Sequence, residues 1–440
     1  MQMKGLRWWV VGLVAIATII NYIDRQTINV LWPENIAPDL FPDMDADGHK
    51  YILGVISTVF IFAYAAGQAI FGKIFDWIGT RLGFVLSIGV WSLATAAHAL
   101  AQGVLSFSFF RAVLGVAEAG NWPGATKANA EWFPTKERAL AQGIFNSGAA
   151  IGGIISIPLI GYMAVFLDWK IIFILVGLVG LLWLVPWWFI VKAPPQAHDW
   201  LTDEEREYIL TGQKVETDAD GQEQERYNPP TGELLKRKES WGVIVASAAI
   251  DPIWWLFIVW IPTYLVEVHG FNVKEIAASG WLPFVGAMFG AWFGGLLAQN
   301  RLKAGWSINA TRKLTITLGC LIMLPALLSL SAASGPWTAL WLMFTILFGF
   351  QTAIGNVQTL PSDLFGKRTV GTLSGIAGMA AKLSAAALTY LVPIMTAGAN
   401  YYSVFALGAG LALTAIASVW LLCGEIKPLK PNTAAGQAHS

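Results

Sequence analysis

Residues 72–81 read GKIFDWIGTR, a short polar stretch enclosed by apolar runs at 51–72 and 82–101. A helix needs about 20 mostly apolar residues to cross the hydrocarbon core of a bilayer, and each of the two runs has this length. The stretch is therefore predicted to be a tight turn that joins two membrane-spanning helices.

Three residues inside this stretch are suited to such a turn. Gly72 has no side chain and is expected to let two helices approach closely. Asp76 could cap a helix N-terminus or pair with a basic side chain across a helical bundle. Gly79 is expected to permit the reversal of the chain. The motif identifies a fold rather than a substrate.

The composition of the whole chain agrees with a membrane protein. Of its 440 residues, 55% are hydrophobic and 13% are charged, and the net charge is zero. Soluble globular chains carry about 25% charged residues, so this composition excludes a disordered chain, a basic nucleic-acid-binding surface and an ordinary soluble enzyme. The two cysteines, Cys320 and Cys423, lie inside apolar runs, which excludes a disulfide scaffold and a cysteine-ligated zinc site.

The chain contains twelve apolar runs long enough to cross a membrane. They lie near 8–31, 51–72, 82–101, 105–128, 139–165, 170–192, 242–267, 276–298, 313–332, 337–361, 370–394 and 402–423. The first run is too long for the apolar core of a secretory signal and lacks a small-residue cleavage site, so it is interpreted as a span.

The distribution of Lys and Arg predicts the orientation, because cytoplasmic loops are enriched in these residues. One set of loops holds Lys4, Arg7, Lys73, Arg81, Lys136, Arg138, Lys236, Arg237, Lys238, Arg301, Lys303, Arg312, Lys313, Lys367 and Arg368. The alternate loops hold only Lys50, Lys170 and Lys274. Both termini and the central loop are therefore predicted to be cytoplasmic, and the acidic loop at 34–47 is predicted to lie outside.

The two halves of the chain repeat a loop motif. EWFPTKERALAQG (131–143) follows the fourth span, and SDLFGKRTVGTLSG (362–375) follows the tenth. Each places an acidic residue, Phe followed by Pro or Gly, and basic residues before small residues that open a helix. Parallel half-repeats of this kind occur in transporters that hold substrate between the halves near the membrane midplane.

The predicted organisation has four parts: a six-helix bundle at 1–192, a cytoplasmic linker at 193–240, a second bundle at 241–423 and a disordered tail at 424–440. In the linker, Thr202 followed three residues later by Glu205 predicts the N-terminus of an amphipathic surface helix. The linker is interpreted mainly as a tether between the bundles.

Ionisable residues inside membrane spans mark function by default, because burying them is costly. The predicted spans contain Asp24, Arg25, Arg111, Glu118, Asp251 and Lys382. Arg25 and Arg111 are expected at similar depth, where two guanidinium groups could hold a carboxylate. Glu118 lies two helical turns below Arg111 and is expected to neutralise it until protonated, with Asp24 as the second proton-coupling candidate.

Other residues have open interpretations. Lys382 could bind substrate or neutralise a buried acid, and Asp251 could serve helix geometry beside Pro252. Trp254 and Trp255 could stack on a sugar or belong to a lipid-facing belt. Polar side chains suited to hydroxyl recognition are Tyr22, Tyr64, Asn146, Gln351 and Asn356.

Several motifs resemble known families. The stretch 72–81 resembles the cytoplasmic signature of the major facilitator superfamily, Gly-x-Leu-x-Asp-x-x-Gly-x-basic. NYIDR (21–25), Arg111 with Glu118, and WFPTKERA (132–139) resemble its anion:cation symporters.

Within that branch, nearly the whole chain resembles bacterial hexuronate transporters. The resemblance is carried by KGLRWW (4–9), LTDEEREYI (201–209), WIPTYLVEVHGFNVKEIA (260–277) and SDLFGK (362–367). It implies uptake of galacturonate or glucuronate with protons. By it, Arg25 and Arg111 would bind the carboxylate, Tyr22 and Tyr64 would line the site, and Asp24 and Glu118 would exchange protons.

Two positions depart from related aldonate transporters. Ala149 and Gly378 stand where those proteins have a glutamine and an asparagine. An aldonate, an aldarate or another organic anion is therefore the alternative substrate.

The sequence as a whole predicts an all-α integral membrane protein with twelve transmembrane helices in two pseudo-symmetric six-helix bundles. We expect a proton-coupled symporter of sugar acids in the bacterial inner membrane, a monomer with no cofactor besides the coupling proton. Its expected partners are a small carboxylate substrate, protons and the lipid bilayer, with no nucleic acid and no metal. An integral-membrane enzyme would need an acidic or histidine cluster at a membrane face, and a channel would favour repeated pore loops.

Overall fold

The computed structural model describes residues 3–134, 137–213 and 227–429, and their regular structure is helical. The helices before residue 193 are α1 (Leu6–Leu31), α2 (Ala37–Leu40), α3 (Ala46–Ala97), α4 (Val104–Glu118), α5 (Asn121–Trp132), α6 (Arg138–Phe166) and α7 (Trp169–Ile190). Two short helices, α8 (Asp203–Gly212) and α9 (Thr231–Leu234), precede the second half of the chain. The remaining helices are α10 (Lys238–His269), α11 (Val273–Ser279), α12 (Leu282–Lys303), α13 (Ile308–Leu330), α14 (Pro336–Leu364), α15 (Lys367–Met395) and α16 (Tyr402–Ala417).

Eleven helical segments in the described part of the chain are long and apolar enough to cross a membrane. The twelfth predicted span, 105–128, is present as α4 and α5, which Ala119 and Gly120 separate. A side chain at Gly120 would crowd Phe71 and Ser87 of α3, with the added Cβ 2.8 and 2.6 Å from their atoms. The break in the fourth span therefore coincides with a close contact between helices.

The stretch 72–81 lies inside the long helix α3 and bends it at a single residue. Gly79 has φ 80° and ψ 171°, outside the helical region, as its predicted role in the chain reversal requires. The carboxylate of Asp76 lies 3.0 Å from the Nζ atom of Lys127 on α5, so it pairs with a base rather than capping a helix.

The expected role of Gly72 is wrong. A Cβ added to Gly72 would meet no described atom within 4 Å, so another helix does not pack against this position. The close approach occurs one to two turns earlier in α3, where Gly67 lies against the backbone of Val116 on α4. The sequence does not show which glycine lies at a contact between helices, and only the tertiary structure distinguishes Gly67 from Gly72.

The second half has a corresponding close contact between α12 and α14. Gly286, Gly290 and Gly294 lie at intervals of four, and a Cβ at any of them would overlap a carbonyl oxygen of α14. Small residues of this kind let membrane helices pack backbone to backbone.

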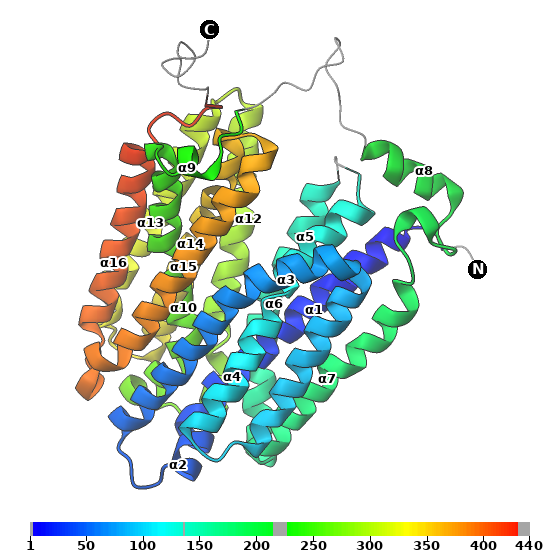
Figure 1. Cartoon of the computed structure of the whole chain (residues 1–440). Helices are drawn as coiled ribbons and strands as arrows, with labels where there is room; N and C mark the ends of the chain where they lie inside the picture. Colours follow the sequence, from blue (N-terminus) through cyan, green and yellow to red (C-terminus); the bar gives the residue numbers. More distant parts are fainter. Residues whose placement is uncertain (1–2, 135–136, 214–226, 430–440) are drawn as a thin grey trace.

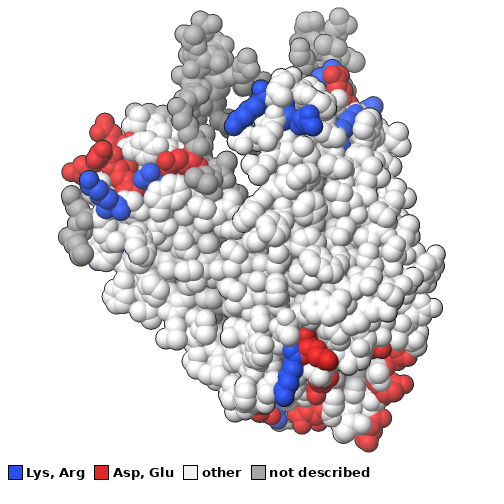
Figure 2. Space-filling view, turned by 180° about the vertical axis from the view of Figure 1, so that it is seen from behind, with Lys and Arg blue, Asp and Glu red and all other residues white. Residues whose placement is uncertain are grey.

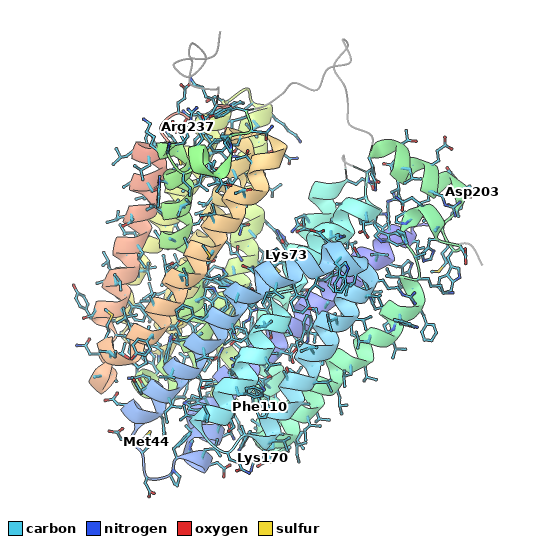
Figure 3. All side chains as sticks on the ribbon, in the orientation of Figure 1. Met44, Lys73, Phe110, Lys170, Asp203 and Arg237 are labelled. Atoms are coloured by element: carbon cyan, nitrogen blue, oxygen red, sulfur yellow. The ribbon has the colours of Figure 1, made fainter. Side chains whose placement is uncertain are left out.

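Two groups of helices are visible in Figure 1, and they converge at the end where α2 lies. At the opposite end, which carries both termini, α8 and α9, the groups stand apart, and the surface is hollowed between them (Figure 2). Met44 and Lys170 mark the convergent end, and Asp203 and Arg237 the open end (Figure 3). Charged residues gather at both ends of the face in Figure 2, with an uncharged band between them, as expected for a membrane-embedded surface.

The linker makes specific contacts in its described parts. The Thr202 side chain accepts a hydrogen bond from the backbone N–H of Glu205 at 3.2 Å, which confirms the predicted start of α8. The Glu205 carboxylate then accepts hydrogen bonds from the backbone N–H groups of Gly5 and Leu6, at 2.8 and 3.2 Å, and so caps the start of α1. Nearby, burial lowers the pKa of His198, whose ring lies against Trp132.

Part of the predicted disordered tail is ordered. Ile426 is buried, and its N–H donates to the side chain of Asn309 at 3.0 Å. The N–H of Leu429 donates to the carbonyl of Leu364 at 2.9 Å. Residues 430–440 lie outside the described residues.

Candidate functional site

The predicted site begins at Arg25, which is 3% exposed in the middle of the fold. Its guanidinium carbon lies 5.0, 5.5, 5.2 and 4.9 Å from the ring centroids of Tyr22, Phe60, Tyr64 and Trp255. Three of these rings come from α1 and α3, and Trp255 comes from α10 in the other half. Cation–π attraction to several desolvated rings stabilises a buried guanidinium, and this cage places Arg25 where the two halves meet.

The partner of Glu118 differs from the expected one. Its Oε2 atom accepts a hydrogen bond from Nη2 of Arg25 at 2.9 Å, and both side chains are almost fully buried. Arg25 also donates to Asn21 Oδ1 at 3.1 Å. In the described residues no hydrogen bond or ion pair joins Glu118 to Arg111, and the two charges interact only over a longer distance. Glu118 instead reaches sideways to α1.

Arg111 is 2% exposed on α4, and its guanidinium carbon lies 4.7 Å from the centroid of Phe60. Arg25 contacts the same ring, so the structure brings together the two guanidinium groups that the sequence expected at one depth. In the described residues, Nε and Nη1 of Arg111 have no hydrogen-bond partner. Unpaired buried donors raise the free energy of the protein. An anion bound at Arg111 would therefore be stabilised by hydrogen bonds to these donors.

Asp24 is the second buried carboxylate near the two arginines. It is 1% exposed, and neither of its oxygens has a hydrogen-bond partner within the described ranges. The Oε1 atom of Glu118 is unpartnered in the same sense. Both carboxylates interact electrostatically with Arg111, so the structure brings the two predicted proton-coupling residues into the region of Arg25 and Arg111.

Lys382 and Asp251 form an ion pair in the second half, between α15 and α10. The Lys382 Nζ atom lies 2.6 Å from Oδ2 of Asp251, and Trp255 Nε1 donates to the same oxygen at 3.2 Å. Lys382 thus has an acidic partner, and Asp251 holds two side chains rather than serving only the helix beside Pro252.

The remaining predicted polar residues are more scattered. Asn146 is exposed on α6 and accepts a hydrogen bond from Gln142 at 3.1 Å. Gln351 is half-buried on α14, next to Phe350, which stacks on Trp254.

Asn356 contacts Arg312 rather than Arg25 or Arg111. Its Oδ1 atom accepts from Arg312 at 2.9 Å, and Arg312 also pairs with Asp363 at 2.8 Å. The structure does not bring Asn356 together with the two arginines of the site. Phe60 was missed, because one Phe among 24 carries no signal of its neighbours, and Asn21 was named only as part of the NYIDR motif and not as a site residue.

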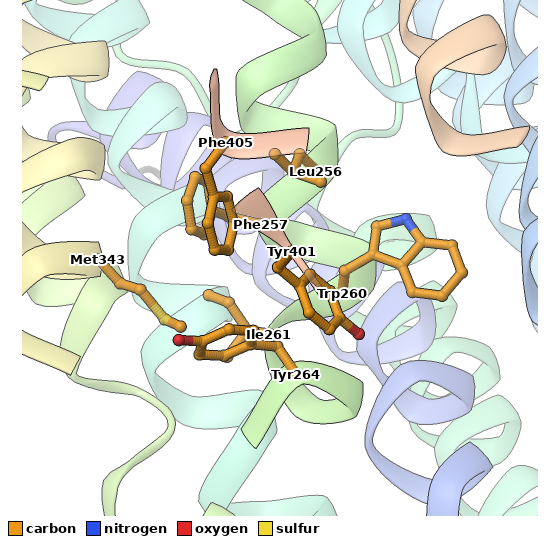
Figure 4. Close-up of a pocket in the computed structure, with 8 residues that line it drawn as sticks. All are labelled: Leu256, Phe257, Trp260, Ile261, Tyr264, Met343, Tyr401 and Phe405. Carbon is orange, nitrogen blue, oxygen red and sulfur yellow. The ribbon is translucent and has the colours of Figure 1, made fainter. Parts of the chain in front are cut away.

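A small pocket beside the site has a different character. It lies along α10 beyond Trp255 and is lined by apolar and aromatic residues that include Trp260, Tyr264 and Met343 (Figure 4). No charged residue of the described chain lines it, so it does not suit an anion. In the described ranges, no cluster of three or more His, Cys, Asp or Glu side chains could hold a metal ion.

The model of the Major Facilitator Superfamily matches residues 14–389 of the chain. The chain belongs to this superfamily. It is a multi-pass membrane transporter rather than an enzyme, and the predicted twelve-helix fold is confirmed. Among solved structures, a D-xylose–proton symporter is similar over 96% of this chain and 99% of its own, with TM-score 0.69 and 16% identity.

Relatives in the superfamily are more similar in sequence. A hexuronate transporter of Escherichia coli K12 is 32% identical over 422 residues, which cover 95% of this chain and 94% of the relative. A galacturonate transporter of Dickeya chrysanthemi is 33% identical over 326 residues, covering 73% and 90%. A probable galactarate/D-glucarate transporter of Bacillus subtilis is 28% identical over 438 residues, covering 96% and 93%.

Proposed function

We propose that this superfamily member imports hexuronates such as galacturonate and glucuronate together with protons. The observation that carries the proposal is the guanidinium of Arg111, buried with unpaired donors beside Arg25 on the ring of Phe60. A planar guanidinium is the side chain best suited to bind a carboxylate with two hydrogen bonds. The hexuronate and galacturonate transporters among the relatives support the same substrate class.

The charges of the site give a physical reason for proton coupling. Away from the span ends, the predicted spans hold three cations, Arg25, Arg111 and Lys382, and three anions, Asp24, Glu118 and Asp251. An anionic substrate would leave one uncompensated negative charge in a site of low dielectric, which is strongly unfavourable. Protonation of one carboxylate restores neutrality, so the proton and the substrate bind together.

Glu118 is the proposed coupling group. When its carboxylate is protonated, the hydrogen bond to Arg25 loses its ionic character, and Arg25 can then join Arg111 in binding the substrate carboxylate. Asp24 is the second candidate, because it is equally buried and no cation forms an ion pair with its carboxylate in the described residues.

Alternating access of the two halves is the proposed transport cycle, with both termini in the cytoplasm. The separation of the halves at the terminal end supports an opening toward that side (Figure 1). The basic residues of 1–7 and 236–238 support a cytoplasmic location of this end in a bacterial inner membrane.

Uptake by purified protein in proteoliposomes tests the proposal. An inward proton gradient should concentrate labelled galacturonate, and substrate added without a gradient should draw protons inward. Glucose should not compete, because a neutral hexose leaves the buried guanidinium groups without an anion. Competition by glucose equal to that by unlabelled galacturonate would exclude a sugar-acid site.

The second candidate substrate class is an aldonate or aldarate. The galactarate/D-glucarate relative supports it, as does a D-galactonate transporter of Escherichia coli that is 27% identical over 425 residues. The same competition assay with galactonate and galactarate separates these classes.

A further inference from the structure

The ion pair of Lys382 and Asp251 lies at the edge of the Arg25 cage, and the function proposed above counts its charges but assigns it no contact with the substrate. The two side chains are 16% and 14% exposed, in contrast to Arg25 and Glu118, which are 3% and 0% exposed. The pair is therefore within reach of a molecule that enters between the halves.

Trp255 connects this pair to the carboxylate-binding arginines. The Arg25 guanidinium carbon lies 4.9 Å from the centroid of the Trp255 ring, and the Lys382 Nζ atom lies 5.6 Å from the same centroid. The indole N–H donates to Asp251. One aromatic ring thus separates a cation of the first half from the ion pair of the second half, and a sugar acid bound by Arg25 and Arg111 would have its far end near the pair.

The pair offers a sugar hydroxyl both kinds of hydrogen-bond partner. Lys382 has three N–H donors, of which one is used by Asp251. In the described residues, the Oδ2 atom of Asp251 accepts two hydrogen bonds and its Oδ1 atom accepts none. A hydroxyl can accept from the ammonium group and donate to Oδ1 at the same time.

A second carboxylate would meet a less suitable environment. An ionised carboxylate only accepts hydrogen bonds, so it could use Lys382 but would face the oxygens of Asp251 with like charge. Unpaired or repelled charges of this kind are a general means of excluding a competing ligand.

We propose that Asp251 is a specificity-determining residue, which keeps Lys382 neutralised so that the site accepts sugar acids with one carboxylate and excludes those with two. This inference rests on the proposed function and deepens it, since it defines which end of the substrate each half recognises. Lys382 and Asp251 bind the hydroxyls of the uncharged end.

The test compares galacturonate, which has one carboxylate, with galactarate, which has two. Each competes against labelled galacturonate in counterflow with wild-type protein and with Asp251→Asn, which keeps the shape of the side chain and removes its charge. Wild type should prefer galacturonate. Asp251→Asn should raise the relative affinity for galactarate by at least about tenfold, because the freed ammonium group gains a carboxylate partner.

Two further variants test whether a gain in galactarate binding depends on the charge of Lys382 or only on looser packing of the site. Lys382→Met, which leaves Asp251 charged, should not gain galactarate binding. The double variant Asp251→Asn/Lys382→Met should lose the gain, since it has no cation to bind the second carboxylate. Should Asp251→Asn fail to reconstitute, Asp251→Ser removes the same charge.

Each result supports or overturns the inference. An unchanged galactarate-to-galacturonate ratio in Asp251→Asn, or equal competition by both acids in wild type, would overturn it. A gain that persists in the double variant would also overturn it. If wild type transports neither galacturonate nor glucuronate, the proposed function itself fails, which is a different outcome from normal hexuronate transport with an unchanged ratio.

Discussion

Arg25 and Arg111 lie on one phenylalanine ring, yet their surroundings differ. Arg25 has Glu118 at 2.9 Å, whereas Nε and Nη1 of Arg111 have no partner in the described part of the chain. A buried guanidinium with unpaired donors is stabilised when an anion arrives. At the scale of single residues, Arg111 is therefore the first group expected to meet the substrate carboxylate, and Arg25 follows when Glu118 releases it.

We expect Arg111→Lys to weaken galacturonate binding by roughly 10- to 100-fold, because a hydrogen bond to a charged group contributes about 1.5–3 kcal/mol. Lysine keeps the charge but replaces a planar fork with a point charge. Counterflow at equal protein density measures the effect. Arg301→Lys, on an exposed arginine at the end of α12, is the matched control. Normal binding by Arg111→Lys would remove Arg111 from the site.

Glu118→Gln tests proton coupling separately from binding. The neutral side chain imitates the protonated carboxyl group and leaves Arg25 available for substrate. We expect this variant to exchange galacturonate in counterflow but not to concentrate it under a proton gradient. Accumulation at the wild-type level would instead direct attention to Asp24, and Asp24→Asn in the same two assays would then be the informative variant.

Close backbone contact between helices decides how each half packs. Along α12, a side chain at Gly290 would overlap the carbonyl oxygen of Phe348, whereas one at Gly295 meets no described atom within 4 Å. The two glycines lie on the same helix, but only Gly290 lacks room for a side chain. Replacing each glycine by alanine therefore separates the effect of the contact between α12 and α14 from the effect of the higher helix propensity of alanine.

We expect Gly290→Ala to lower the free energy of unfolding by roughly 1–3 kcal/mol, because an added methyl group forces α12 and α14 apart. Gly295→Ala should be neutral or stabilise by up to about 1 kcal/mol, since alanine favours helices. Thermal unfolding of the two variants in one detergent measures both changes. Equal melting temperatures would show that the α12–α14 contact is not close in solution.

At the scale of the whole molecule, polar contacts hold the two halves together at the convergent end. Lys50 on α3 is 1% exposed, and its Nζ atom lies 3.1 Å from Glu267 and 2.8 Å from the carbonyl of Thr396, both in the second half. The hydroxyl of Tyr401 donates to the same Glu267 carboxylate at 2.7 Å. The Tyr401 contact lies within the second half, whereas the two contacts of Lys50 cross between the halves and must break if the halves separate at this end.

Lys50→Met should therefore populate forms in which the convergent end is open. Spin labels at positions 43 and 400, which are exposed on opposite halves of this end, report the separation. We expect the distance distribution to gain a longer component in the variant. Lys170→Met, at the same end but 4.0 Å from Asp39 of its own half, is the control and should leave the distribution unchanged. An identical distribution in Lys50→Met would show that Lys50 does not hold the halves together.

The sequence by itself determined the membrane class, the approximate positions of the twelve spans and the reversal of the chain at Gly79, whereas for Asp76 it predicted either helix capping or pairing with a base. These features depend on local properties: run length, hydrophobicity, and a glycine or charge at a fixed place in a short motif. A charged residue inside an apolar run is likewise recognisable from the local sequence, and this pattern predicted that Arg25, Arg111, Asp24 and Glu118 belong to one site.

Only the tertiary structure decided which of these charges meet. Glu118 pairs with Arg25 rather than with Arg111, Lys382 pairs with Asp251, and Asn356 binds Arg312 instead of lying with the two arginines. The close helix contact that was expected at Gly72 is found at Gly67. The physical reason is that partners on different helices depend on the rotation and crossing of those helices, and these follow from packing over the whole bundle rather than from spacing along one chain segment.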